Sequence, residues 1–400
     1  MNTIPLPARP GDHARPVRAW HAALAGFSAS LVGIGLARFA YTPLLPALVS
    51  AHWFSPALAA YLGAANLAGY LAGALLGRPI AARLSPATTL RSMMLLTGLS
   101  LLACAWPAGA PWFFVWRFLS GLAGGALMVL AAPTVLPHVP AQRRGMVGGI
   151  VFMGIGLGIV ASGTLLPMLL QLGLRAAWLG LGVLALLLTA LAWGGWPHGS
   201  SAAPATATMA RAPNRRLRAL YASYALNAVG WVPHMLFLVD FIARGLGLGL
   251  RTGAAYWVVF GIGASVGPIA AGHVADRIGF GRTLRLALVL QAAGVVLPAL
   301  ATTTAALVAS SLIVGAFVTG AVPLVLGRLH ELLPGQPQRQ GQAWRTATAA
   351  FAVCQALAAW GFSFLFGRNG GDYGPLFLIG TGAIGLSLAI DVMSIRKRGQ

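Results

Sequence analysis

Runs of about twenty apolar residues recur along the whole chain, and they constrain its fold more than any other feature. A helix needs about 20 residues to cross ~30 Å of hydrocarbon, and short links bearing arginine, glycine and proline separate the runs. The ten-residue alternation of apolar and polar residues expected of a membrane barrel is absent. Only 8% of the residues are charged, against about 25% in soluble domains. The sequence therefore predicts an all-α polytopic membrane protein.

Twelve transmembrane helices are expected, in two pseudo-symmetric six-helix bundles. The predicted spans are 20–49, 56–77, 90–107, 111–137, 147–171, 175–195, 218–243, 253–272, 284–302, 306–329, 344–366 and 375–394. The predicted domains are a cytoplasmic tail (1–19), a first bundle (20–196), a cytoplasmic linker (197–217), a second bundle (218–395) and a short tail (396–400). The first run follows arginines, as in a signal peptide, but its length and its continuation into further spans indicate a retained helix.

Arginines lie mainly in links on one side of these spans. Clusters around Arg83, Arg144, Arg216 and Arg282 share that side with both tails, whereas the opposite links carry only isolated arginines. Cytoplasmic loops are enriched in Lys and Arg, so we expect an inner-membrane (plasma-membrane) protein with both termini in the cytoplasm. This distribution explains the net charge of +21 better than nucleic-acid binding does.

The two halves also resemble one another. Gly121 precedes Pro140 by the same separation as Gly315 precedes Pro334, and each proline is followed by a basic link, QRRG or QRQG. Internal repeats on this scale are typical of transporters whose binding site lies near mid-membrane between the halves.

The stretch GHVADRIGFGR, from Gly272 to Arg282, resembles the signature loop of the major facilitator superfamily (MFS). Its glycines allow a tight turn, and Asp276 can accept from backbone N–H groups at a helix N-terminus or pair with arginine. The resemblance implies that Asp276, Arg277 and Arg282 latch a cytoplasmic gate against the start of the fifth span, near Arg144.

The first-half counterpart of this loop, GRPIAARLS, is incomplete. Arg83 matches Arg277, but Ala82 stands where the aspartate would be. The first-half latch is therefore either weakened or made by other residues, with Glu331 at the cytoplasmic end of the tenth span as a candidate.

The fourth span carries a second resemblance. WRFLSGLAGGALMVLAAP places Arg117 ahead of Gly121 and Gly125, which is similar to the fourth-helix pattern of the superfamily. Arg117 lies about 9 Å into the helix, so it either faces a cavity or snorkels to the interface. The fifth span, GIGLGIVASG, lacks the Gly-Pro of the antiporter pattern, which argues against antiport or drug efflux.

Over its full length the chain resembles an MFS transporter. The stretches GLARFAYTPLLP and VPHMLFLVDFIARGLG are similar to the YbfB/YjiJ-type subgroup. The resemblance implies the MFS fold and a transport role, with the first, fourth, seventh and tenth helices lining a central cavity.

Arg38 is the charged residue that most needs explanation, because it lies within the first apolar span. Charged side chains inside a membrane normally face a protein interior or a water-filled cavity, and guanidinium groups bind carboxylate or phosphate bidentately. No acidic residue lies securely at mid-membrane. We therefore expect an anionic substrate. The candidate binding residues are Arg38, Tyr41, Arg117, Tyr224, Asn227, Trp231 and His234.

The last four of these candidates form a stripe on the seventh span. Their spacings of three, four and three place them on one helix face, either lining a cavity or hydrogen-bonding neighbouring helices. If protons are the coupling ion, His234 is the first candidate carrier and Asp240 the second. Four further polar residues are consistent either with close helix packing or with a polar cavity wall: Asn66 and Tyr70 on the second span, and Thr348 and Gln355 on the eleventh.

These features favour a secondary active transporter that moves a small organic anion by alternating access. A multidrug or metabolite exporter of the same fold is the nearest alternative, and a non-transporting receptor or scaffold is another. An enzyme is not expected, because no Ser-His-Asp grouping, metal-ligand spacing or phosphate loop is present. We expect no cofactor and no metal, isolated thiols at Cys104 and Cys354, and a monomer in the lipid bilayer.

Overall fold

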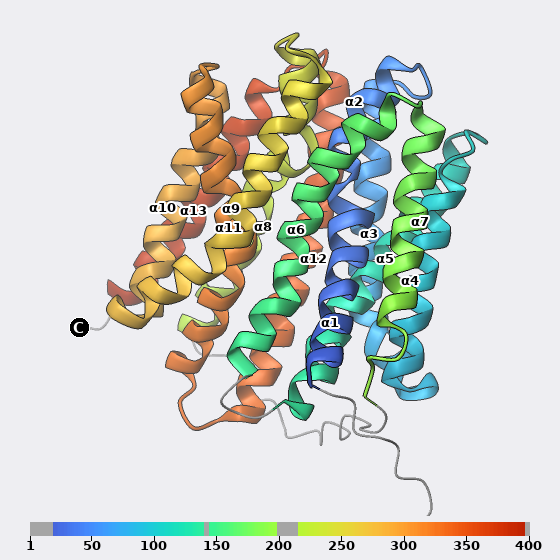
Figure 1. The fold of residues 1–400 in the computed structure, drawn as a ribbon. Coiled ribbons are helices and arrows are strands. Elements are labelled where there is room, and N and C mark those ends of the chain that lie inside the picture. The colour runs from blue at the N-terminus through green and yellow to red at the C-terminus, as the bar shows by residue number, and fades with distance from the viewer. Residues whose placement is uncertain (1–18, 140–143, 198–214, 397–400) are drawn as a thin grey trace, which may run out of the picture.

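The computed structural model describes residues 19–139, 144–197 and 215–396 as two groups of helices. The first half contains α1 (Ala19–Ser30), η1 (Leu31–Phe39), α2 (Tyr41–Ser50), α3 (Pro56–Leu84), α4 (Pro86–Ala103), α5 (Ala110–Val135), η2 (Leu136–His138), α6 (Arg144–Leu170) and α7 (Leu174–Ala192). The second half contains α8 (Arg215–Asp240), η4 (Phe241–Gly245), α9 (Gly249–Ile278), α10 (Phe280–Leu300), α11 (Thr304–Leu332), α12 (Pro337–Arg368) and α13 (Gly374–Arg396). Figure 1 shows the two groups side by side.

The predicted all-helical membrane fold is confirmed. Within the described residues, eleven helical segments are long and apolar enough to cross a membrane. α1, η1 and α2 together make one of these spans, Trp20–Ser50, which includes a wide π-helical stretch over η1. α4 is the remaining helix of the expected twelve. Its first turns are polar, with Thr88, Thr89 and Arg91, and this lowers its mean hydropathy.

Several helices extend beyond the predicted spans at the end of the bundle where the links are basic. α3 continues to Leu84 and α9 to Ile278. Hydropathy marks the hydrocarbon layer, whereas a helix continues until a residue ends it. The residues that end these two helices are Ser85 and Gly279, which have positive φ angles of 88° and 85°. The Ser85 side chain also caps the start of α4 by accepting from the Thr88 N–H.

Glycines bring one pair of helices in each half into backbone contact. A Cβ at Gly121 of α5 would lie 1.9 Å from the carbonyl oxygen of Asn66 in α3. A Cβ at Gly315 of α11 would lie 2.1 Å from that of Phe260 in α9. Small residues allow this approach in membrane bundles, where van der Waals packing holds helices together. The α3–α5 and α9–α11 pairs are thus equivalent glycine seams.

The two halves meet mainly along three helix pairs, with a smaller contact between α2 and α9. α6 packs on α9, where a Cβ at Gly156 would lie 2.8 Å from the backbone nitrogen of Ser265. α3 packs on α12, and α2 packs on α8, where the Thr42 hydroxyl donates to the Met235 carbonyl oxygen.

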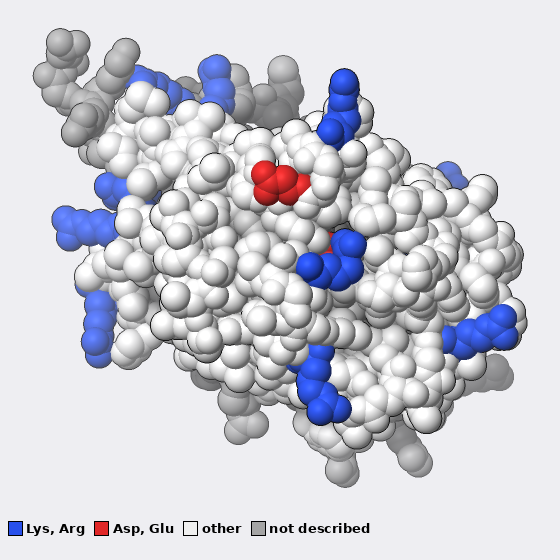
Figure 2. Space-filling model, turned by 90° about the horizontal axis from the view of Figure 1, so that it is seen from above, with Lys and Arg blue, Asp and Glu red and all other residues white. Residues whose placement is uncertain are grey.

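The outer end of the bundle, at which α12 ends, carries little charge. Figure 2 shows it as a mostly uncharged face with scattered basic side chains and some acidic atoms among them. Arg175, Arg251 and Arg368 lie exposed in or beside its links. The orientation of this end toward the periplasm remains a prediction.

The signature-loop residues lie at the opposite end. Asp276, Arg277, Arg282 and the first-half Arg83 are all exposed. Arg143 and the side chain of Arg144 are outside the described part of the chain, so the latch remains a prediction.

Glu331, the other candidate for a latch, is engaged within the second half. Its carboxylate accepts from the Phe280 N–H at 2.8 Å and from Arg328 at 2.6 Å. It therefore caps the start of α10.

Candidate functional site

The Arg38 side chain lies where the two halves meet. It comes from the end of η1, is 8% exposed, and donates from Nε and Nη2 to the Met235 sulfur of α8 at 3.3 and 3.1 Å. Its Cζ lies 5.3, 5.1 and 5.5 Å from the ring centroids of Phe39, Tyr70 and Trp231. We call these five residues the Arg38 junction. Cation–π contacts stabilise a guanidinium in such a setting.

No carboxylate balances this charge within the described residues. The ion pairs there are Arg244–Asp240, Arg285–Asp391 and Arg328–Glu331. A buried cation without a counter-ion is costly, and a thioether sulfur is a weak hydrogen-bond acceptor. The junction therefore presents a guanidinium that a stronger, anionic acceptor would stabilise.

Arg117 lies deeper in the first half and does not reach the membrane interface, so its snorkelling alternative is wrong. Its side chain is 2% exposed, and Nη1 donates to the Ala37 carbonyl at 2.7 Å. Its guanidinium lies 4.2 Å from the ring centroid of Tyr41, whose hydroxyl donates to the Ala59 carbonyl at 2.7 Å. Arg117 and Tyr41 thus fix the first helix against α3 and α5, directly behind Arg38.

The seventh-span stripe divides into two rows. Tyr224 and Trp231 both pack on Phe351 of α12, with ring centroids 4.5 and 6.4 Å apart. Trp231 also lies 6.4 Å from Phe39 of η1. This row faces the Arg38 junction.

The second row faces the interior of the second half. The Asn227 amide donates to Gln291 of α10, and the His234 Nε2 lies 2.7 Å from the Ser310 hydroxyl of α11. Each row consists of residues seven apart, which is about two helical turns, so the two rows run side by side along α8 and contact different neighbours.

Asp240 is neutralised at the outer end of α8. Its carboxylate, which is 0% exposed, accepts from Nε and Nη2 of Arg244 at 2.5 Å and from the Tyr373 hydroxyl at 2.7 Å. These bonds tie η4 to the loop before α13.

Gln355 of α12 is a buried amide with open hydrogen-bonding capacity. It is 1% exposed, and neither side-chain atom has a partner within the described residues. Helical spacing places it on the face of α12 that carries Phe351 and Phe366, and these residues pack on Trp231 and Phe237 of α8. Gln355 therefore lies on the α12 face that packs on α8, one turn from Phe351, which contacts Trp231 of the junction.

Met235 was not predicted, because nothing in its sequence context distinguishes it from a packing residue. Tyr70 and Gln355 were visible as polar positions, but their roles depend on which helices surround them.

The chain matches the family described as uncharacterised MFS-type transporter YbfB over residues 30–393. It belongs to this family. The protein is therefore an MFS transporter and not an enzyme, which confirms the family and the class of function that the signature loop implied.

Named relatives of this MFS transporter differ in what they carry or resist. It is 26% identical over 363 residues to a gallate transporter of Pseudomonas putida, covering 78% of each chain. It is 28% identical over 375 residues to a chloramphenicol resistance protein of Streptomyces lividans, covering 88% of this chain and 91% of the relative. An inward-open structure of the xylose transporter XylE from E. coli has the same fold, with a TM-score of 0.74, 16% identity, and coverage of 96% and 98%.

Proposed function

We propose that this transporter carries a small organic anion by alternating access, with Arg38 binding the anionic group. The observation that carries the proposal is the position of Arg38. It is a buried guanidinium between the two halves, held by a thioether sulfur rather than by a carboxylate. A carboxylate accepts two parallel guanidinium hydrogen bonds and would displace the weaker sulfur.

The surroundings of Arg38 suit an aromatic carboxylate. The rings of Tyr70 and Trp231 lie beside the guanidinium, and aromatic rings stack favourably on one another. On the same face of α12 as Phe351, which packs on Trp231, the Gln355 amide has no hydrogen-bond partner within the described residues and offers both a donor and an acceptor. The gallate transporter among the relatives carries a substrate of this class.

A binding site at this point would couple substrate to the contact between the halves. Two groups of Met235 accept hydrogen bonds from the first helix: its sulfur accepts from Arg38, and its carbonyl oxygen accepts from Thr42. A carboxylate that displaces the sulfur removes one of these two links between the first helix and α8. We infer that this exchange lowers the barrier to rocking of one half against the other.

The test is uptake of gallate and related aromatic carboxylates into proteoliposomes by the parent and by Arg38→Gln. We expect the variant to lose about 10- to 100-fold in substrate affinity, since a hydrogen bond to a charged group contributes about 1.5–3 kcal/mol. Arg91→Gln is the matched control, because Arg91, like Arg38, lies over a tryptophan and makes a side-chain hydrogen bond, in its case to the Trp193 carbonyl oxygen, but it lies outside the junction. Equal uptake by Arg38→Gln and the parent would refute the proposal.

A second candidate is export of neutral amphipathic compounds across the same aromatic surface. The chloramphenicol resistance relative favours it. This function predicts efflux of neutral compounds that Arg38→Gln leaves unchanged, together with no uptake of carboxylates. A receptor would bind a ligand but would show neither uptake nor efflux of it.

A further inference from the structure

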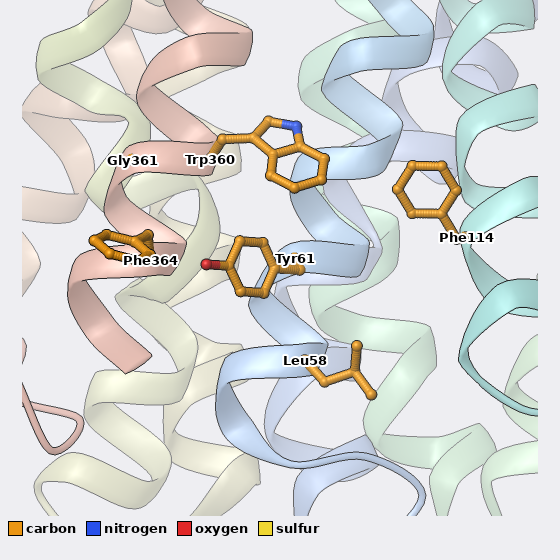
Figure 3. Close-up of a pocket in the computed structure, with 6 residues that line it drawn as sticks. All are labelled: Leu58, Tyr61, Phe114, Trp360, Gly361 and Phe364. Carbon is orange, nitrogen blue, oxygen red and sulfur yellow. The ribbon is translucent and has the colours of Figure 1, made fainter. Parts of the chain in front are cut away.

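An apolar groove opens on the lipid-facing side of the seam between the halves, apart from the Arg38 junction. It has a volume of about 560 Å³ and is lined by Leu58, Tyr61, Phe114, Trp360, Gly361 and Phe364. Figure 3 shows that α3, α5 and α12 each contribute to its walls. Trp360 and Phe114 are each 39% exposed and Phe364 is 53% exposed. Because these rings lie on membrane-spanning helices, the groove opens toward hydrocarbon.

The walls of the groove are fixed by ring contacts between the halves. The Trp360 ring centroid lies 5.3 Å from that of Tyr61 and 6.4 Å from that of Phe114. Gly361 provides the space beside these rings, since a Cβ placed there would have no heavy atom within 4 Å. The groove is thus lined by aromatic side chains whose positions are set by their contacts with one another.

The guanidinium of Arg368 lies beside one end of the groove. The Arg368 Cζ lies 5.6 Å from the ring centroid of Phe364, and Arg368 ends α12, eight residues beyond Trp360. Eight helical residues span about 12 Å, so this guanidinium lies at the end of α12, beyond the apolar wall. Arg368 makes no ion pair within the described residues, and nearby Asp372 uses its carboxylate to accept from the Gly374 N–H.

We propose that a membrane phospholipid binds here, with an acyl chain in the groove and its phosphate on Arg368. An apolar channel that ends at an unpaired guanidinium matches the two parts of such a lipid. Guanidinium groups bind phosphate oxygens in bidentate fashion, and within a bilayer, where there is no water to escape from, van der Waals packing against the aromatic walls would hold the acyl chain.

This site depends on how the halves are arranged. Leu58, Tyr61 and Phe114 belong to the first half, whereas Trp360, Gly361 and Phe364 belong to the second. Next to the groove the two helices touch, because a Cβ at Gly367 would lie 3.2 Å from the Ala57 Cβ. A lipid seated against both walls therefore favours the arrangement in which α3 and α12 are packed together.

The experiment is native mass spectrometry of the delipidated full-length protein titrated with phosphatidylglycerol. Gly361→Leu adds a side chain on the groove wall at a position where the Cβ has no neighbour within 4 Å, and Gly382→Leu is its control, because Gly382 is an exposed glycine of α13 that also has no atom near its Cβ position. We expect Gly361→Leu to weaken binding of the first lipid at least tenfold relative to Gly382→Leu. Equal affinities for these two variants would overturn the site.

The phosphate contact is tested separately with Arg368→Gln and, as control, Arg251→Gln, another exposed arginine at the same end of the bundle. We expect Arg368→Gln alone to weaken phosphatidylglycerol binding about fivefold or more and to leave binding of diacylglycerol with the same chains unchanged. Equal losses for both lipids would overturn the assignment of the phosphate. In the unmutated protein, a photoreactive acyl chain should label peptides containing Trp360 or Phe364, and labelling only of distant helices would contradict the proposal.

Discussion

Two equivalent turns adopt one backbone conformation with different residues, which makes an internally controlled prediction possible. Ser85 joins α3 to α4 with φ 88° and ψ 149°, and Gly279 joins α9 to α10 with φ 85° and ψ 151°. Only glycine adopts this region without strain. We expect Ser85→Gly to stabilise the protein and Gly279→Ser to destabilise it.

The magnitude follows from three contributions. A non-glycine residue in this region is strained by about 1–3 kcal/mol. Replacing a capping serine by glycine loses only about a few tenths of a kcal/mol, although the Ser85 hydroxyl does accept from the Thr88 N–H at 3.2 Å. Glycine also gives the unfolded chain more conformational freedom, which reduces the gain from relieved strain by about 0.4–1 kcal/mol. The net gain for Ser85→Gly is about 1 kcal/mol.

Gly279→Ser should lose a similar amount, for conformational rather than steric reasons. A Cβ at Gly279 would lie 3.5 Å from the Glu331 carboxylate, which is an ordinary contact. The measurement is reversible unfolding in mixed micelles followed by tryptophan fluorescence. Ser85→Ala is the control, because it removes the cap and keeps the strain. If Ser85→Gly destabilised the protein as much as Ser85→Ala does, capping would outweigh strain and the reasoning would fail.

Two further predictions concern the helix seams and the outer loop. Gly121→Ala places a Cβ where the Asn66 carbonyl oxygen leaves only 1.9 Å, so we expect a sharp loss of monodisperse protein on size-exclusion chromatography, whereas Gly382→Ala should express normally. Burial, together with the adjacent Asp240 carboxylate, raises the pKa of Tyr373 above its usual range. Because the folded pKa is the higher one, this stabilising contribution is complete below about pH 10 and is lost as the pH rises through the folded pKa. Tyrosinate absorbance should therefore rise by the same amount up to about pH 10 in Tyr373→Phe as in the parent. A smaller rise in the variant would mean that Tyr373 ionises below about pH 10 and would contradict the prediction.

Hydropathy was enough to predict the helical fold, because crossing a hydrocarbon layer requires long apolar helices whatever their neighbours are. It was less informative for α4, whose polar first turns dilute the pattern, and for helix ends, which depend on residues such as Ser85 and Gly279. The glycine pattern around Gly121 and Gly315 indicated the repeat, and the structure gives it a physical basis in backbone contact.

The site was less accessible to sequence reasoning. Arg38 stood out because a charge in an apolar span is costly. The partner of that charge could not be predicted, since a methionine such as Met235 is common in packed helices. A spacing argument placed Tyr224, Asn227, Trp231 and His234 on one face, but it could not show that two neighbouring rows of that face contact different helices.

The glycine seams have a consequence for how transporters of this kind change over generations. Gly121 and Gly315 leave no room for any side chain, so mutations there are expected to be eliminated by loss of folding. The aromatic and thioether groups around Arg38 carry no such restriction, because side chains rather than backbone meet there. Under the proposed function, new substrate preferences can therefore arise by drift at that junction while the scaffold of each half is inherited unaltered.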